Sequence, residues 1–287
     1  MSTLFVFGEV LFDCFPDGTE VLGGAPFNVA WHLQALGNRP RFISRVGRDT
    51  HGSEIRSAME KAGMCLADLQ EDASRPTGRV RIEIEDGEPR YDIEADAAYD
   101  FIAASDVPSA APGDIVYHGS LALRNEVSRL AFERCAAEPG ASVFVDVNLR
   151  PPWWRREEIE AMLMRARWAK MNEAELHALG FDAESLSENT RRFHERFPVE
   201  QLIVTRGAEG ATVSTRDGTV HRRSPPAPER FVDAVGAGDS FSAAYLHGLR
   251  AGWPIERTLD VAQRLAAMVV SIRGATPPDP SFYDTLL

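Results

Sequence analysis

Residues 231–241 read Phe-Val-Asp-Ala-Val-Gly-Ala-Gly-Asp-Ser-Phe and join a short apolar run to a segment with the apolar period of a helix. A glycine-rich turn that opens a helix presents backbone N–H groups without partners at the positive end of the helix dipole. Gly236 and Gly238 also lack side chains that would keep an anion away from the backbone. The stretch therefore predicts an α/β fold with an anion site of the kind that binds phosphate.

Asp239 ends this turn. A carboxylate there repels phosphate, but it can accept a proton beside the anion site. The simpler interpretation is that Asp239 caps the helix, since aspartate is common at that position. The whole string from Asp233 to Asp239 favours the catalytic interpretation.

The rest of the chain alternates short apolar segments with segments of helical period, which is typical of a parallel sheet covered by helices on both faces. We expect strands at residues 4–7, 42–46, 115–118, 143–147, 168–171 and 202–205. We expect helices at residues 26–36, 50–62, 126–137, 156–165, 173–179, 186–196, 240–251 and 255–273. The predicted fold class is α/β, with a doubly wound, mostly parallel sheet in a single domain that covers residues 1–287.

Residues 79–93 break this pattern. Apolar and charged residues alternate from Arg79 to Glu85, an Asp-Gly pair follows, and the alternation resumes at Tyr91. This pattern predicts a hairpin with one apolar and one charged face. Such a hairpin cannot lie in a sheet covered on both faces, because its charged residues would be buried. We therefore expect a small β lid, formed approximately by residues 10–24 and 76–100.

Composition excludes several partners. The chain has 31 basic and 43 acidic residues, a formal net charge of -12 and no basic block, so nucleic acid is not an expected partner. Its three cysteines belong to no zinc or disulfide pattern and indicate a reduced, cytoplasmic protein. Glu9 and Asp13 interrupt the N-terminal apolar run, so we expect neither an export signal nor a membrane partner.

Two separated motifs resemble the signatures of the ribokinase-like (PfkB) carbohydrate kinases. The string from Asp233 to Asp239 resembles the family's DTxGAGD motif, with Ala234 in place of the usual threonine. Residues 23–30, Gly-Gly-Ala-Pro-Phe-Asn-Val-Ala, resemble the other signature. The resemblance implies a ribokinase-like fold and an ATP-dependent sugar kinase that uses ATP and Mg²⁺, with K⁺ as a further candidate. Asp239 and Arg150 are then the catalytic side chains, and the anion hole is formed by the N–H groups of Gly236, Ala237 and Gly238.

The resemblance also places residues beside the sugar. Asn28 offers both a donor and an acceptor, and the family's asparagine binds sugar hydroxyls, although an isolated asparagine more often bonds to nearby backbone. Asp13 follows the first predicted strand, and a carboxylate can accept from two vicinal hydroxyls. Residues 146–154 resemble the DxNxRPxxW element of fructokinases, in which Arg150 suits a phosphoryl group or a ketose oxygen. The predicted sugar-binding residues are Asp13, Gly24, Asn28 and Asn148.

A third group of residues is expected beside the nucleotide. Asn172 and Glu175 match the family's NxxE motif, in which Glu175 is the candidate magnesium ligand, partly through water. The same pattern is also a good helix start. Gln263 stands where relatives often carry an asparagine near the adenine. The predicted nucleotide-binding residues are Asn172, Thr205, Gly207, Gly238 and Gln263.

Several candidate residues follow the carboxyl ends of predicted strands, where ligands bind in open parallel sheets. The motifs are most similar to those of bacterial fructokinases, which implies MgATP and fructose as substrates and a homodimer through the lid. Other acceptors, of the 2-keto-3-deoxygluconate or ribose type, stay open. A non-catalytic sugar-sensing protein would lack the base or the anion hole, and both are present. No GxGxxG follows the first strand and no GxxxxGK[ST] occurs, which disfavours nicotinamide enzymes and P-loop kinases.

Overall fold

The computed structural model describes residues 2–85, 88–277 and 279–286, without the side chains of residues 83–85 and 88–90. Its central sheet has nine strands in the order β13-β12-β11-β10-β9-β8-β1-β4-β5. The strands from β11 to β5 in this order are parallel, and β12 and β13 are added antiparallel at one edge. The parallel strands are β1 (Leu4–Phe7), β4 (Arg41–Gly47), β5 (Leu69–Asp72), β8 (Ile115–His118), β9 (Ser142–Asp146), β10 (Trp168–Asn172) and β11 (Gln201–Thr205).

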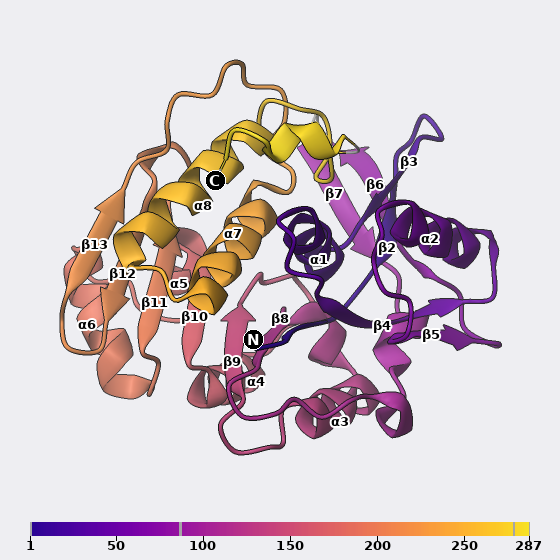
Figure 1. Ribbon diagram of the computed structural model, residues 1–287, viewed down its shortest axis with the longest axis horizontal. Helices are drawn as coiled ribbons and strands as arrows, with labels where there is room; N and C mark the ends of the chain where they lie inside the picture. Colours follow the sequence, from indigo (N-terminus) through magenta and orange to yellow (C-terminus); the bar gives the residue numbers. More distant parts are fainter. Residues whose placement is uncertain (1, 86–87, 278, 287) are drawn as a thin grey trace.

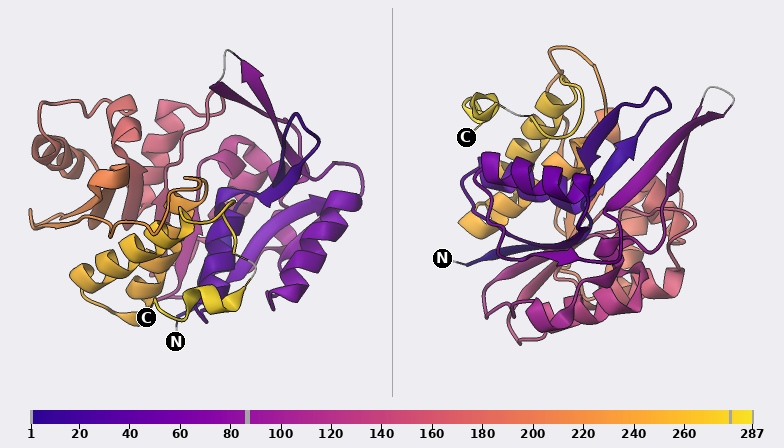
Figure 2. Two further views of the ribbon diagram at one scale, coloured as in Figure 1. Left: turned by 90° about the horizontal axis from the view of Figure 1, so that it is seen from above. Right: turned by 90° about the vertical axis from the view of Figure 1, so that its right-hand side faces the viewer.

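Helices cover both faces of this sheet (Figures 1 and 2). One face carries α1 (Ala25–Ala35), α2 (Thr50–Lys61), α7 (Ala237–Ala251) and α8 (Ile255–Val269). The other carries α3 (Glu126–Cys135), α4 (Arg156–Arg165), α5 (Glu173–Ala178) and α6 (Leu186–Arg196). Strand β1 shows why both faces need cover, since Leu4 and Val6 pack on the first side and Phe5 and Phe7 on the second. The predicted α/β fold class is confirmed.

The predicted hairpin lies outside the central sheet. Strands β6 (Gly78–Glu85) and β7 (Glu88–Ile93) pair antiparallel, and β6 also pairs with β2 (Leu11–Cys14), which pairs with β3 (Glu20–Gly23). The result is a separate four-stranded sheet that projects from the body (Figure 2). Val80 and Ile82 are buried on it, as the alternation predicted. The predicted turn at 86–87 lies outside the described residues, and the single-domain division stays a prediction.

Three sequence expectations need correction. The edge strands β5, β12 (Ala211–Thr215) and β13 (Val220–Arg223) had not been predicted. Helix α7 begins at Ala237 instead of residue 240, so Asp239 lies inside its first turn, and α8 ends at Val269 instead of residue 273. Asp13 belongs to strand β2 of the small sheet, opposite Val21, within the segment 10–24 that was expected to form the lid.

No helix in the described part of the chain combines the length and the apolar character needed to cross a membrane.

Candidate active site

The site is built around the N-terminus of α7. Gly236 is the N-cap of this helix, in the left-handed conformation with φ 77°. The Asp233 side chain accepts a 3.0 Å hydrogen bond from the Val235 N–H, and the Ala237 N–H donates a longer, 3.3 Å bond to the Ala234 carbonyl. For the N–H groups of Gly236, Gly238 and Asp239, no partner exists within the described residues. The turn therefore offers unpaired donors at the positive end of the helix, as an anion site requires.

The two glycines of this turn are glycines for different reasons. At Gly236 an added Cβ would overlap the Cβ of Ala275, and its positive φ already disfavours other residues. At Gly238 the φ is not positive, and an added Cβ would lie an ordinary 3.5 Å from Lys170 Nζ. The fold therefore requires Gly236 but does not require Gly238. Close approach of an anion to the backbone is a reason for the second glycine that packing does not supply.

Asp239 does not cap α7. Gly236 holds the N-cap position, and no side chain makes a capping hydrogen bond at this helix start. Instead, Asp239 Oδ2 accepts a 2.8 Å hydrogen bond from Nδ2 of Asn28 in α1. Burial raises the pKa of Asp239 to about 6, while the bond from Asn28 lowers it, Asp146 raises it, and Lys170 and Arg150 lower it. A carboxyl with this pKa is mostly ionised at neutral pH and can accept a proton.

Asn28 is 5% exposed and contacts Asp239 instead of the nearby backbone, contrary to the interpretation of an isolated asparagine. Its Oδ1 is buried without a partner among the residues whose side chains are described. Gly24 is the N-cap of the same helix, with φ 106°, and an added Cβ would lie 2.7 Å from the Glu9 carbonyl. The first turn of α1 therefore packs closely on the segment after β1 and presents one unused acceptor.

The positive charge of Arg150 lowers the pKa values of Glu9, Asp13 and Asp239, although the Arg150 side chain is exposed. Burial raises the pKa of Asp13 to about 6, Arg150 opposes this shift and Asp239 adds to it. Asp13 and Asp239 therefore act on each other, although Asp13 lies in the small sheet and Asp239 in helix α7. Asn148, two residues before Arg150, has a φ of 39°, and its carbonyl accepts from Ser120 Oγ at 3.2 Å.

Asn172 and Glu175 form a capping box at the start of α5. Asn172 Oδ1 accepts from the Glu175 N–H, and Glu175 Oε2 accepts from the Asn172 N–H, both at 2.8 Å. Glu175 Oε1 accepts a 2.9 Å bond from the Leu149 N–H, next to Arg150. Both carboxyl oxygens are therefore engaged, and the helix-start interpretation describes what this pair does here. Burial and then the charge of Asp146 raise the pKa of Glu175, so a cation nearby would be favoured.

The remaining nucleotide-side candidates lie on neighbouring elements. Thr205 ends β11 directly opposite Asn172, and Gly207 opens a short 3₁₀ turn. Gln263, however, is 4% exposed, and its Nε2 donates to the Arg223 carbonyl at 3.1 Å. The Gln263 side chain thus joins α8 to β13.

Sequence reasoning missed two charged groups of the site. Glu9, two residues after the end of β1, is 3% exposed, and burial raises its pKa to about 7. Lys170 Nζ donates a 2.7 Å bond to Asp146 Oδ2, which also accepts from Ser242 Oγ at 2.8 Å. This buried ion pair lies beneath the α7 turn, since Ser242 also bonds to the Gly238 carbonyl. Two signals were available in the sequence. Lys170 is a charged residue inside an apolar strand, and Glu9 is a charged residue shortly after the end of another strand.

The chain is similar to known proteins over nearly its whole length. The model of the pfkB family carbohydrate kinases matches residues 8–281. Fructokinase of Escherichia coli is 30% identical over 294 residues, which cover 96% of this chain and 95% of that protein.

Two solved structures are similar over nearly the whole chain. A double mutant of fructokinase from Vibrio cholerae O395, bound to fructose, ADP and potassium, is 28% identical with a TM-score of 0.84, over 100% of this chain and 99% of that one. Aminoimidazole riboside kinase from Salmonella enterica, complexed with aminoimidazole riboside and an ATP analog, is 25% identical with a TM-score of 0.86, over 99% of each chain.

Proposed function

The chain belongs to the pfkB family of carbohydrate kinases, and from this premise we propose that it transfers the γ-phosphoryl group of ATP to D-fructose, giving D-fructose 6-phosphate. As a family member it is a phosphotransferase with an alcohol group as acceptor. The observation that carries the proposal is the hydrogen-bonded pair of Asn28 and Asp239 beside the unpaired N–H groups of α7. This pair brings together the proposed sugar-binding residue Asn28, the proposed base Asp239 and the proposed anion site.

In this mechanism Asp239 takes the proton of the attacking hydroxyl. The N–H groups of Gly236 and Gly238 stabilise the charge that develops on the transferring phosphoryl group. The Ala237 N–H contributes less in the geometry seen here, because it donates to the Ala234 carbonyl. Arg150 adds a mobile positive charge, since its side chain is exposed.

On the sugar side we propose Asp13, Asn28 and Asn148 as hydroxyl-binding residues, with Gly24 allowing close approach of the backbone. The unpartnered Oδ1 of Asn28 supports a role as acceptor. Fructose is preferred because of the resemblance of residues 146–154 to fructokinases and the similarity to the Escherichia coli and Vibrio cholerae enzymes. A ribose-type acceptor is the alternative, because the aminoimidazole riboside kinase is similar over the whole chain.

On the nucleotide side we propose that Asn172, Thr205 and Gly207 contact ATP and that Glu175 holds Mg²⁺ through water. The water-mediated form follows from the backbone bonds to both Glu175 oxygens. Magnesium would neutralise phosphate charge during the transfer. We propose a potassium requirement as well, because the Vibrio cholerae structure contains potassium. Gln263 bonds to the Arg223 carbonyl, and we propose that it thereby positions β13 on the adenine side of the nucleotide.

A homodimer through the four-stranded sheet is a separate proposal. Tyr91 on β7 and Phe15 after β2 are large exposed apolar residues on this sheet, and a second copy would cover them. Sedimentation of the purified protein at micromolar concentration tests it, and a monomer there would contradict the dimer but not the kinase.

A turnover screen tests the kinase and its acceptor. The purified protein is assayed with MgATP against fructose, other ketohexoses, aldohexoses, ribose, nucleosides and keto-deoxy acids. Fructose should give the highest kcat/KM, and Arg150→Ala should lower kcat. Better turnover of ribose or of a keto-deoxy acid would contradict fructose as the acceptor but not the kinase activity. A protein that turns over none of these acceptors would overturn both.

A further inference from the structure

Glu9 is a buried carboxyl with no assigned task. It lies two residues after the end of β1, it is 3% exposed, and its Oε2 has no hydrogen-bond partner in the part of the chain that the structure describes. Its backbone is held tightly, because added Cβ atoms at Gly8 and Gly24 would overlap Pro26 and the Glu9 carbonyl, respectively. The backbone of Glu9 therefore has a fixed place at the junction of β1 and α1.

The groups around Glu9 are those of the candidate active site. After burial and its own backbone N–H, the charges that act on the pKa of Glu9 are those of Arg150, Asp239 and Arg124. They belong to the segment after β9, to α7 and to the 3₁₀ turn Leu121–Arg124 after β8. Glu9 thus feels the charges of the base and of the sugar-side cation, both of which the proposed mechanism already uses.

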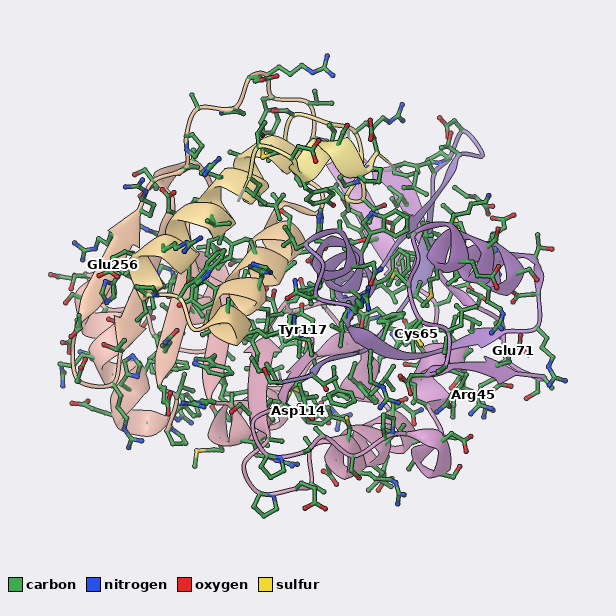
Figure 3. All side chains as sticks on the ribbon, in the orientation of Figure 1. Arg45, Cys65, Glu71, Asp114, Tyr117 and Glu256 are labelled. Atoms are coloured by element: carbon green, nitrogen blue, oxygen red, sulfur yellow. The ribbon has the colours of Figure 1, made fainter. Side chains whose placement is uncertain are left out.

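Two further polar atoms near Glu9 also lack partners. The Tyr117 hydroxyl on β8 is buried and unpaired among the described residues, and the pKa of Tyr117 is raised well above its ordinary value by burial and then by Asp146, Asp239 and Glu9. Figure 3 labels Tyr117 near the middle of the molecule, between the ribbons of α7 and β1. Arg124 pairs with Asp100, but its Nη1 has no partner within the same described residues. Three elements therefore contribute unused polar atoms around one place.

A buried carboxyl oxygen without a hydrogen-bond partner destabilises the free protein, so its presence requires a reason. A structural role for this oxygen would show as a bond to the surrounding protein, and Oε2 makes none with the described residues. We propose that Glu9 is a further substrate-recognition residue, whose carboxyl binds a hydroxyl group of the acceptor sugar. This inference rests on the proposed function for its substrate class, a polyol, and goes beyond it by naming the residue that selects among sugars.

The chemistry of the group fits a hydroxyl. Burial raises the pKa of Glu9 to about 7, so both the protonated and the ionised form are accessible near neutral pH. Glu9 can therefore donate to or accept from a hydroxyl, which itself does both. A site that bonds a substrate hydroxyl strongly rejects the analogue without it, because the buried group is then left unpaired.

A cycle of substrate and protein changes tests the proposal. kcat/KM is measured for fructose and for each single deoxy analogue that keeps the accepting 6-hydroxyl, with the wild type, Glu9→Gln and Glu9→Met. In the wild type, removal of the hydroxyl that Glu9 binds should lower kcat/KM roughly 10- to 100-fold. In Glu9→Met, the same analogue should differ from fructose by less than about threefold, and Glu9→Gln should be intermediate. Ratios for the other positions should stay as in the wild type.

The control is Glu160→Gln on α4. Glu160 also has one buried oxygen without a partner among the described residues, but its other oxygen accepts from Arg196 of α6. Glu160→Gln should leave every ratio of kcat/KM between a deoxy analogue and fructose at its wild-type value. Thermal unfolding supplies a second readout, because removal of an unbonded buried carboxyl should leave the Tm of Glu9→Met equal to or above the wild-type value.

Unchanged ratios in both Glu9 variants, or a Tm lowered by several degrees, would make Glu9 a structural residue and overturn the proposal. If the wild type prefers another sugar, only the fructose assignment fails, and the cycle is run with the deoxy analogues of that sugar. If the wild type neither phosphorylates nor binds any sugar of the screen by calorimetry, both proposals fail.

Discussion

Asn28 and Asp239 are 211 residues apart in the sequence and share a 2.8 Å hydrogen bond, from Asn28 Nδ2 to Asp239 Oδ2. This bond joins the first turn of α1 to the first turn of α7, so each of the two signature motifs positions a residue of the other. It also favours the ionised form of Asp239, because a donated hydrogen bond stabilises a carboxylate.

Loss of the Asn28 amide should therefore move the pH dependence of the reaction. In Asn28→Ala the pKa of Asp239 should rise above about 6, because burial and Asp146 still raise it while only Lys170 and Arg150 still lower it. The acid limb of kcat/KM against pH should shift to higher pH, so activity falls more at pH 6 than at pH 8. Asn38→Ala is the control, since Asn38 is also buried but bonds to Leu33 and His247. An acid limb at the wild-type pH in Asn28→Ala would show that this bond does not tune the base.

The two glycines of the α7 turn should respond differently to the same added methyl group. Gly238→Ala should keep the wild-type Tm or raise it slightly, since alanine is favoured over glycine in a helix by about 1 kcal/mol. It should nevertheless lower kcat/KM for ATP at least about tenfold, because the methyl group stands where the anion approaches. Gly236→Ala should lower stability by about 1–3 kcal/mol, from the positive φ and the overlap with Ala275. Thermal unfolding and ATP titrations measure both, and full activity in Gly238→Ala would contradict an anion site at this turn.

Replacement of Glu175 should change the response to magnesium. Glu175→Gln should raise the Mg²⁺ concentration needed for half-maximal rate, because it removes a negative charge from the proposed metal site. It should also lower the Tm slightly, since the amide nitrogen of glutamine cannot accept either of the two backbone N–H bonds, from Leu149 and Asn172, that the carboxylate accepts. Glu173→Gln is the matched control, with the same charge change in the same turn of α5. If both variants give the same magnesium titration, the Asn172 and Glu175 motif is only a helix start.

Strongly patterned elements could be predicted from the sequence, and the sheet edges could not. Strands β1 and β8 are buried apolar runs and have the predicted bounds, as do α4 and α6. Strand β13 reads Val-His-Arg-Arg and lies mostly exposed at the edge, so it carries no apolar run for a sequence pattern to detect. Strand β2 lies within the segment 10–24 that was expected to join the lid, but its bounds and its pairing with β6 could not be read from the sequence.

The candidate site divides in the same way. Glycines, Asn28 and Asp239 stand in recognisable motifs, so their proximity could be anticipated. The charge on Lys170 could be read from the sequence, but its ion pair with Asp146 under the α7 turn arises from the packing of β9, β10 and α7. The same holds for Glu9, whose importance comes from burial and from the bonds that it does not make. Burial and pairing are tertiary properties, and a single sequence without its fold does not contain them.

The decisive prediction concerns Asp239 itself. Asp239→Asn keeps the size of the side chain and removes its ability to accept a proton. Because Gly236 is the N-cap and Asp239 makes no capping bond, the change should not weaken the start of α7. The amide oxygen of the new side chain can still accept from Asn28 Nδ2, so the contact between α1 and α7 should persist.

Stability and ligand binding of Asp239→Asn should therefore stay near wild type, while kcat falls at least about a hundredfold, as is typical when a general base is removed. Thermal unfolding, calorimetry with an ATP analogue and with sugar, and initial rates at saturating substrates measure the three quantities separately. Asp217→Asn is the control for charge, because Asp217 only closes an exposed turn by accepting from Thr215 and Thr219. A folded Asp239→Asn protein that binds both substrates and turns over at nearly the wild-type rate would show that another group takes the proton.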